Sequence, residues 1–345
     1  MIENVRQLFQ MVVDKVGDSS RVRILKGSSN SGSYPSLPGL LEAQNEEYLS
    51  LRTASADLKG IFTGMGFLLG GYGLCLFALI FLSSDVSSID WWLLFYSILA
   101  IVLPLVWETS RPPSLPIIFN RRTQEIYYDR KGQLYHAIWE GIEAAAYEYN
   151  MVNQNTGSMP HGSLEIILQK FGEPDDRIVL SLSGGAAGRQ IATLITMSEY
   201  VRRYMTVGPW FDEAGRKTDQ INPFIEKTLK EGRMSFLDYE RSNREYLAQE
   251  RREGNGISGT AVFLWVGSYL FFPMAYGMEV VQRSDRKKIM RQWPEVVRVR
   301  LHPNGPKTRL IDIEESYLVQ REKEEQQKQK ELEELHERMR RTLPR

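Results

Sequence analysis

The sequence has little of what enzymatic or metal chemistry requires. It holds a single cysteine, Cys75, which excludes a disulfide within the chain and a cysteine-based metal site. No phosphate-loop lysine motif and no G-x-S-x-G elbow are present. The four histidines are scattered, and none is paired at ligand spacing: His136, His161, His302 and His336. We therefore predict a non-enzymatic protein without a metal or another cofactor.

Net charge and a signal peptide are also missing. Lys plus Arg and Asp plus Glu both number 43, so nothing in the overall charge indicates nucleic-acid binding. The first residues, MIENVRQLFQMVVDKV, carry acidic side chains and no sufficient apolar core, which argues against a secretory signal peptide. Residues 2–16 instead have the pattern of a short amphipathic helix within an N-terminal segment, residues 1–59. Of this segment we expect residues 40–59 to be helical.

Two long runs without charge stand out against this background. Residues 61–84 and 91–107 are uncharged. As a helix the first run exceeds the ~30 Å hydrocarbon core, and the second lies at the short end of the spanning range. Helices are required there because lipid offers no partners to bare backbone groups. Trp91, Trp92 and Trp107 mark the ends of the second run, where indole rings prefer to lie. Residues 60–108 are therefore predicted to form a transmembrane helical hairpin.

Positive charge sets the orientation of this hairpin. The link at residues 85–90 has no Lys or Arg, whereas cations flank both ends of the hairpin. Positive residues stay on the cytoplasmic side, so we expect both flanks in the cytoplasm and the link outside. The flanking cations are Arg52, Lys59, Arg111, Arg121 and Arg122.

Gly66, Gly70 and Gly73 fall on one face of the first predicted span. Small residues at this spacing let helix backbones approach closely. We expect this face to pack against the second span or against another copy of the chain, as in a homo-oligomer.

The next unit, residues 112–210, has the pattern of an antiparallel sheet closed by a helix. Four strands with short links are predicted at residues 115–120, 124–129, 133–138 and 139–149, and a hairpin joins residues 164–171 to 177–182. Residues 153–162 read as a polar loop. Apolar residues at helical spacing over residues 189–205 predict the closing helix. The fold class expected for the whole chain is a membrane α+β protein.

The stretch PIIFNRRTQEIYYDRKGQLYHAIWEGIEA resembles pleckstrin-homology-like (PH-like) modules, including bacterial membrane ones. Residues 34–210 also look like a family of uncharacterised Gram-negative inner-membrane proteins that are often encoded beside type VI secretion genes. The resemblance implies a cytoplasmic PH-like domain behind a pair of spans in the bacterial inner membrane. It brings no catalytic residue with it.

A charged helical region, residues 218–253, is expected to pack back on the sheet and leads to a third apolar segment at residues 254–280. A full crossing would place the cations that follow outside, against the orientation rule. A re-entrant or surface-lying segment keeps them inside, and a buried soluble helix is the third alternative. Held inside, these cations would contact anionic lipid headgroups: Arg283, Arg286, Lys287, Lys288 and Arg291.

The C-terminal part divides in two. Residues 296–302 alternate as VVRVRLH, a Pro-Asn-Gly-Pro turn follows, and residues 307–313 return, which predicts a β-hairpin within the basic segment, residues 283–313. The tail, residues 314–345, is a charged helix whose apolar positions are too few for a heptad stripe.

Three weaker candidates for chemistry remain. Residues 183–188, SGGAAG, lie between a strand and a helix and could hold an anion, although a plain turn fits them better. Glu140, Glu143 and Glu148 could do acid–base work, but carboxylates on a strand more often face water. Arg121 and Arg122 could bind a phosphate, yet they serve equally as topology determinants near the bilayer.

These patterns favour a membrane-anchored interaction protein that contacts lipid and an unidentified protein partner. The family resemblance suggests a type VI secretion accessory, either an effector-associated adaptor or an immunity protein. The alternative is a protein that senses or handles anionic lipid.

Overall fold

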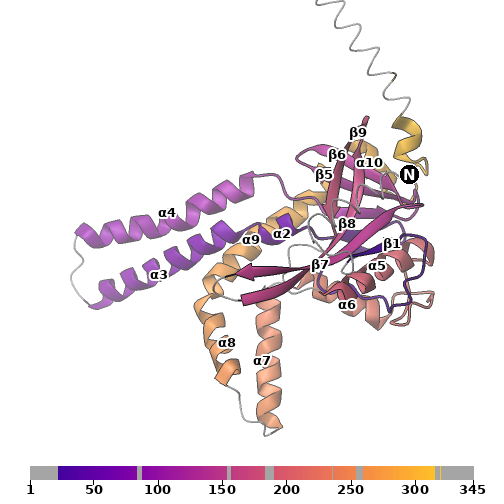
Figure 1. The fold of residues 1–345 in the computed structure, drawn as a ribbon. Helices are drawn as coiled ribbons and strands as arrows, with labels where there is room; N and C mark the ends of the chain where they lie inside the picture. The colour runs from indigo at the N-terminus through magenta and orange to yellow at the C-terminus, as the bar shows by residue number, and fades with distance from the viewer. Residues whose placement is uncertain are drawn as a thin grey trace, which may run out of the picture.

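The computed structural model describes residues 22–83, 88–153, 157–182, 190–234, 236–253, 259–314 and 319. It is a mixed α+β fold in which a nine-stranded antiparallel sheet carries helices on its faces and a long helical hairpin at one end (Figure 1). Three predicted features lie outside the described residues: the amphipathic helix at 2–16, the glycine-rich segment 183–188 and nearly all of the charged tail.

The sheet runs in the order β1-β7-β8-β6-β5-β4-β3-β2, with β9 paired to the other edge of β8. The longest strand, β8, pairs first with β7 and then, at Gln169 and Lys170, with β6. The strands are β1 (Val22–Lys26), β2 (Leu41–Gln44), β3 (Tyr48–Leu51), β4 (Ile117–Asn120), β5 (Glu125–Arg130), β6 (Gln133–Ile138), β7 (Glu143–Asn153), β8 (Gly157–Lys170) and β9 (Glu173–Ser181).

The predicted strands and closing helix of this unit are found, with several boundaries moved: the strand expected at 139–149 is β7 at Glu143–Asn153, and the one expected at 177–182 is β9 at Glu173–Ser181. Strands β4, β5 and β6 occupy the expected residues, β8 and β9 form the expected hairpin, and α5 (Ile191–Thr206) closes the unit. The polar loop expected at residues 153–162 is mostly strand, because β8 begins at Gly157 and pairs with β7 up to Asn153.

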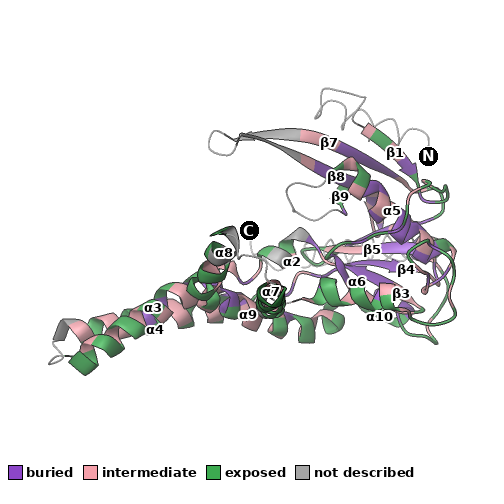
Figure 2. Ribbon diagram, turned by 90° about the horizontal axis from the view of Figure 1, so that it is seen from below, coloured by how far each residue is buried: buried purple, intermediate pink, exposed green. Residues whose placement is uncertain are grey.

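One face of the sheet is covered by α5 and by α6 (Pro223–Arg233). The apolar stripe of α5 places Leu194, Tyr200 and Tyr204 in the main core, all fully buried. Helix α6 packs against β2, and Gly232 allows the contact because a Cβ there would lie 1.8 Å from the Leu41 carbonyl oxygen. The purple residues in Figure 2 trace this core along α5 and the strands.

The opposite face is covered by the C-terminal segment, where the predicted hairpin at 296–313 is wrong. Glu295–Arg300 forms a short helix, α10, that starts after Pro294. Val297 and Leu301, four residues apart, pack with Trp293 and Leu310 onto Ile118 and Tyr127 of the sheet. The stretch VVRVRLH is too short to distinguish the apolar period of a strand from that of a helix. Packing against the sheet favours the helix.

A buried polar network fixes this segment to the sheet. The Glu125 carboxylate accepts hydrogen bonds from the Leu310 amide at 2.7 Å and the Tyr127 hydroxyl at 2.8 Å. Glu314 accepts from the Gly172 amide at 2.7 Å and the Gln169 side chain at 3.0 Å. Fully buried His136 lies between the two carboxylates, 3.7 Å from Glu125 and 3.5 Å from Glu314.

The helix expected at residues 40–59 is also wrong. This stretch forms β2 and β3, and only α2 (Ala54–Leu58) is helical. The Asn45 side chain accepts hydrogen bonds from the Glu47 and Tyr48 amides and so makes the turn between the strands. Pairing with β4 then buries Leu49 and Leu51 completely.

The charged region and the third apolar segment form a chain of four helices. These are α6, α7 (Phe236–Arg252), α8 (Gly259–Leu270) and α9 (Phe272–Gln292). The expectation that the charged region packs on the sheet holds for α6 only, because α7 packs against α8 and α9.

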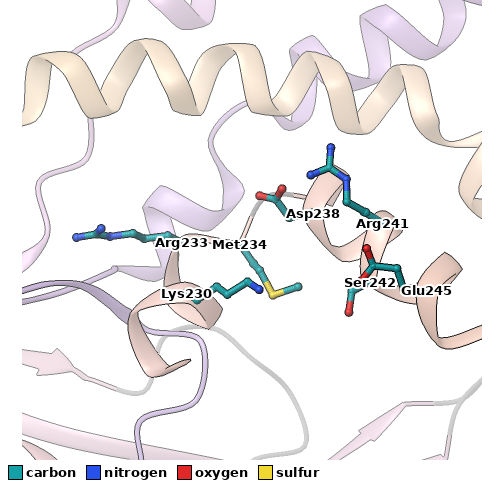
Figure 3. A pocket seen from close by; sticks show the side chains of 7 residues that line it. All are labelled: Lys230, Arg233, Met234, Asp238, Arg241, Ser242 and Glu245. Carbon is teal, nitrogen blue, oxygen red and sulfur yellow. The ribbon is translucent and has the colours of Figure 1, made fainter. Parts of the chain in front are cut away.

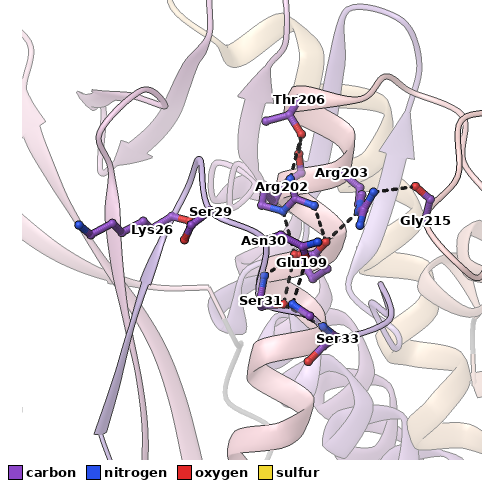
Figure 4. Close-up of polar contacts among 11 residues, drawn as sticks. Lys26, Ser29, Asn30, Ser31, Ser33, Glu199, Arg202, Arg203, Thr206 and Gly215 are labelled. Carbon is purple, nitrogen blue, oxygen red and sulfur yellow. Dashed lines mark hydrogen bonds and ion pairs between the residues drawn. The ribbon is translucent and has the colours of Figure 1, made fainter.

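A buried ion cluster holds two loops on α5 (Figure 4). The Glu199 carboxylate is 1% exposed and accepts hydrogen bonds from Arg202, Arg203 and the Ser31 amide and hydroxyl. Arg203 also donates to the Gly215 carbonyl at 3.0 Å. Burial alone would raise the pKa of Glu199, but these hydrogen bonds outweigh it and hold the pKa below its ordinary value.

This lowered pKa predicts an acid-sensitive share of the stability. The ionised cluster stabilises the fold above the pKa of an unfolded glutamate, and the contribution is lost as pH falls through the lower, folded pKa. At neutral pH, Glu199→Gln should lower the free energy of unfolding by about 1–3 kcal/mol. Urea unfolding of the detergent-solubilised chain between about pH 7 and about pH 3 should show the gap to wild type closing. A gap that stays constant with pH would contradict this assignment.

Candidate functional site

The helical hairpin consists of α3 (Ile61–Ser83) and α4 (Ser88–Ser110), and both helices are long enough and apolar enough to cross a bilayer. Only 11% of the most apolar stretch of each is buried, so large apolar side chains such as Leu69, Leu79 and Leu103 point outward. Both helices extend away from the sheet, and exposed residues run along their length in Figure 2. A core helix of a soluble domain would have its apolar side chains covered.

The face with Gly66, Gly70 and Gly73 lies against α4. A Cβ at Gly66 would be 2.2 Å from the Ala100 carbonyl oxygen, and one at Gly70 would be 2.5 Å from the Ser97 carbonyl oxygen. The sequence predicts that this face packs against another helix. In the structure that helix is α4 of the same chain.

A second glycine face of α3 lies against α9, and sequence reasoning missed it. A Cβ at Gly64 would be 2.7 Å from the Met274 carbonyl oxygen, and Gly60 meets the Met278 backbone. From the other side, Gly277 of α9 faces Phe67 and the Thr63 carbonyl. The spacing of Gly60 and Gly64 was the available signal, but nothing in the sequence paired it with Gly277.

The third apolar segment is bent rather than continuous. Helix α8 ends at Leu270, and α9 begins after Phe271 with Pro273 in its first turn. The Tyr72 hydroxyl donates to the Leu270 carbonyl at 2.5 Å, which places the bend about 18 Å along α3 from Gly60, at ~1.5 Å rise per residue. Aromatic side chains around the bend are exposed: Phe263, Trp265, Tyr269, Phe271 and Phe272.

A polar base joins these helices where they meet the sheet. Buried Glu108, at the end of α4, accepts hydrogen bonds from the Gly60 and Thr63 amides and so caps the start of α3. Lys59 forms an ion pair with Asp285 of α9 at 2.6 Å. Lys288 donates to the Thr109 carbonyl at 2.9 Å. We call Lys59, Glu108, Asp285 and Lys288 the polar base.

The five cations predicted to contact headgroups all lie on α9 but point in different directions. Lys288 belongs to the polar base, and Arg286 donates to the Arg233 carbonyl at the end of α6. Loss of solvent, with the positive charge of Arg52 and Arg233, lowers the pKa of Arg286. Arg283 pairs with Glu279 and is mostly exposed, and Arg286, Lys287 and Arg291 are also exposed. Lys288 is half-buried, so it is the one member of the predicted five that packing withdraws from solvent.

The acidic and basic candidates for chemistry are dispersed. Glu148 accepts from the Ile191 amide at the start of α5, while the Glu140 side chain is 81% exposed and 3.9 Å from Arg309. Arg121 and Arg122 hold the backbone of other loops, at the end of β4 that is remote from α4. Their role as topology determinants near the bilayer stays a prediction. Among the residues that the structure describes, no three potential metal ligands lie together.

A cleft of about 400 Å³ lies between α6 and α7 (Figure 3). Lys230 and Met234 face Asp238 and Arg241 across it, and the lining also includes Arg233, Ser242 and Glu245. Cations and acids alternate around the cleft, and Ser242 and Glu245 lie close together on α7. This arrangement suits a solvated joint between two helices.

No family model, curated protein or solved structure matches the chain. A function therefore has to be inferred from the geometry of the chain. Its distinctive part is the three-helix element of α3, α4 and α9 with the polar base.

A glycine in the α3–α4 contact and a helical glycine without any close neighbour should respond differently to alanine. Gly66→Ala should lower the free energy of unfolding by about 1–3 kcal/mol, because its methyl group overlaps the Ala100 carbonyl. Gly267→Ala in α8 meets nothing within 4 Å and should be neutral or stabilising by up to about 1 kcal/mol. Thermal unfolding followed by tryptophan fluorescence compares the two, and equal effects would contradict the packing role of Gly66.

Proposed function

We propose that the chain is a non-enzymatic interaction protein anchored in the bacterial inner membrane, with its sheet unit on the cytoplasmic side. The apolar, outward-facing α3 and α4 support membrane insertion. Lys59 and Arg111 lie at the sheet end of the hairpin, and the link at residues 85–90 has no cation, which supports a cytoplasmic sheet.

In this arrangement α8 and α9 enter the membrane without crossing it. The charged helix α7 leads into α8, and α9 returns to the sheet, so both ends of the segment lie on one side. The bend at Phe271 reaches about 18 Å along α3, roughly half-way through a ~30 Å core. The cations of α9 then stay on the cytoplasmic side, as the orientation rule requires.

The proposed interaction role is supported by one feature of the sheet, the outer half of the β7–β8 hairpin. Glu148–Asn153 and Gly157–Gly162 pair with each other and, within the described part of the chain, with no other strand. Two strands alone are marginally stable in water, and both of their edges can accept a further strand. In Figures 1 and 2 this arm leaves the sheet on the same side as α3 and α4. Its partner is therefore a protein at the same membrane.

The resemblance to PH-like modules and to proteins encoded beside type VI secretion genes narrows the partner further. It favours a type VI secretion component, with this chain as an effector-associated adaptor or an immunity protein. This part of the proposal rests on the resemblance alone.

The topology can be tested with single cysteines in a Cys75→Ser background. Ser87→Cys, in the link, should react with a membrane-impermeant maleimide on intact cells. Asp175→Cys, exposed on the β8–β9 hairpin, should react only after the membrane is permeabilised. Wild-type Cys75, within α3, serves as the control and should stay unlabelled on intact cells. Labelling of Asp175→Cys from outside would refute the proposed orientation.

The arm can be shortened without disturbing the rest of the sheet. Tyr149 and His161 are register partners, so residues 150–160 can be replaced by an Asn-Gly turn. The shortened chain should remain in the membrane fraction but lose the type VI component that cross-links to the wild type in cells. Arg298→Gln, an exposed change elsewhere, should keep it. An unchanged set of cross-linked proteins would remove the arm from the interaction.

A further inference from the structure

One cavity lies directly beside the proposed membrane boundary. It has a volume of about 640 Å³, within the range of small-molecule sites. One wall is the linker that leaves α4, with Pro112, Pro113 and Ser114, and the facing wall is the β5–β6 turn. Ser55 and Gln292 complete the lining from α2 and from the end of α9. Trp107, whose ring supports the Arg111 guanidinium at 3.5 Å, lies one turn of α4 before this linker.

The rim of this cavity is cationic. Arg130 and Lys131 belong to the β5–β6 turn, and Arg111 begins the linker. None of the three forms an ion pair within the part of the chain that the structure describes. The Asp129 carboxylate also lines the cavity and accepts from the Gly132 amide at 3.0 Å, and Glu108 caps α3. An anion at the rim would therefore meet two cations of the lining against one carboxylate, which is a net positive charge.

The interior of the cavity is of a different kind. Pro112, Pro113, Leu115 and Tyr128 give it apolar surface, while the Ser55 and Ser114 hydroxyls and the Gln292 amide can donate hydrogen bonds. Such a mixture suits a compact polar group with a carbon backbone better than a bare ion. A phosphate ester of a small polyol has this composition.

We propose that this cavity binds the phosphate-bearing headgroup of an anionic membrane lipid. Arg130 and Lys131 hold the phosphate, the serine hydroxyls and Gln292 contact the polyol, and the acyl chains lie along the exposed side of α4. The proposal rests on the membrane placement given above, which brings the headgroup layer level with Arg111. A soluble phosphate ester has the same recognisable chemistry, so the two sources must be separated by experiment.

The test uses the full-length chain in neutral detergent, titrated with a short-chain phosphatidylglycerol and followed by thermal stabilisation. Phosphatidylglycerol should stabilise the wild type, and short-chain phosphatidylcholine should not. Arg130→Gln with Lys131→Asn should weaken the apparent affinity roughly tenfold to hundredfold, given the contribution of each cation near an anionic lipid surface. Asn suits position 131, whose φ of 56° lies in the left-handed region.

Two further variants separate the cavity from general surface charge. Arg298→Gln with Lys307→Gln removes the same charge from exposed positions elsewhere and should leave the affinity unchanged. Ser114→Phe fills the cavity without changing charge and should abolish the stabilisation. Equal affinities for all variants would overturn the proposal. Stabilisation by glycerol phosphate or inorganic phosphate as strong as that by the lipid would overturn a lipid ligand.

A measurement on isolated membranes distinguishes failure of the headgroup site from failure of the proposed membrane placement. Alkaline carbonate washing of membranes should leave the chain in the pellet, and its release would refute the anchor itself. Retention in the pellet together with no preference for phosphatidylglycerol would overturn only the headgroup site.

Discussion

The buried carboxylate of Glu108 is the contact on which the arrangement of helices depends. It accepts two amide hydrogen bonds at the start of α3, where the helix dipole and bare N–H groups favour an anion. Because Glu108 ends α4, the cap closes the hairpin at its base. Lys59, just before α3, pairs with Asp285 and donates to the Arg111 and Pro112 carbonyls. Breaking a buried pair of this kind typically costs about 3–5 kcal/mol, so the base fixes the angle between anchor and sheet.

Both faces of the sheet are covered by segments that also contact the helices, and these contacts fix the sheet relative to the polar base. Helix α6 packs on β2 over one face, and the segment after α9 packs over the other. Arg286 of α9 and Arg52, directly after β3, both donate to carbonyls at the end of α6, where cations are favoured. The helical hairpin, the sheet and the C-terminal segment therefore form one connected body.

The sequence predicts elements whose signal is local, and it fails where distant contacts decide. The uncharged runs predict α3 and α4, and the Arg130-Lys131-Gly132 turn between alternating residues predicts β5 and β6. The sequence predicts a helix where β2 and β3 lie, because four-residue strands carry too little periodicity. The pairing of β3 with β4 also spans the whole helical hairpin in sequence. The same holds for α10, whose helical form depends on a sheet far earlier in the chain.

The candidate sites show the same difference between local signals and distant contacts. Gly66, Gly70 and Gly73 could be read from spacing alone, since one helix face displays them. The face of Gly60 and Gly64 could not, because its partner Gly277 lies in a segment whose apolar run is broken by Pro273. The cations of α9 could be counted but not oriented: a helix turns consecutive residues to different sides, so Lys288 faces α4 while Lys287 faces solvent. Charge counts therefore say how many cations a segment carries, and only packing decides which of them remain available to a ligand.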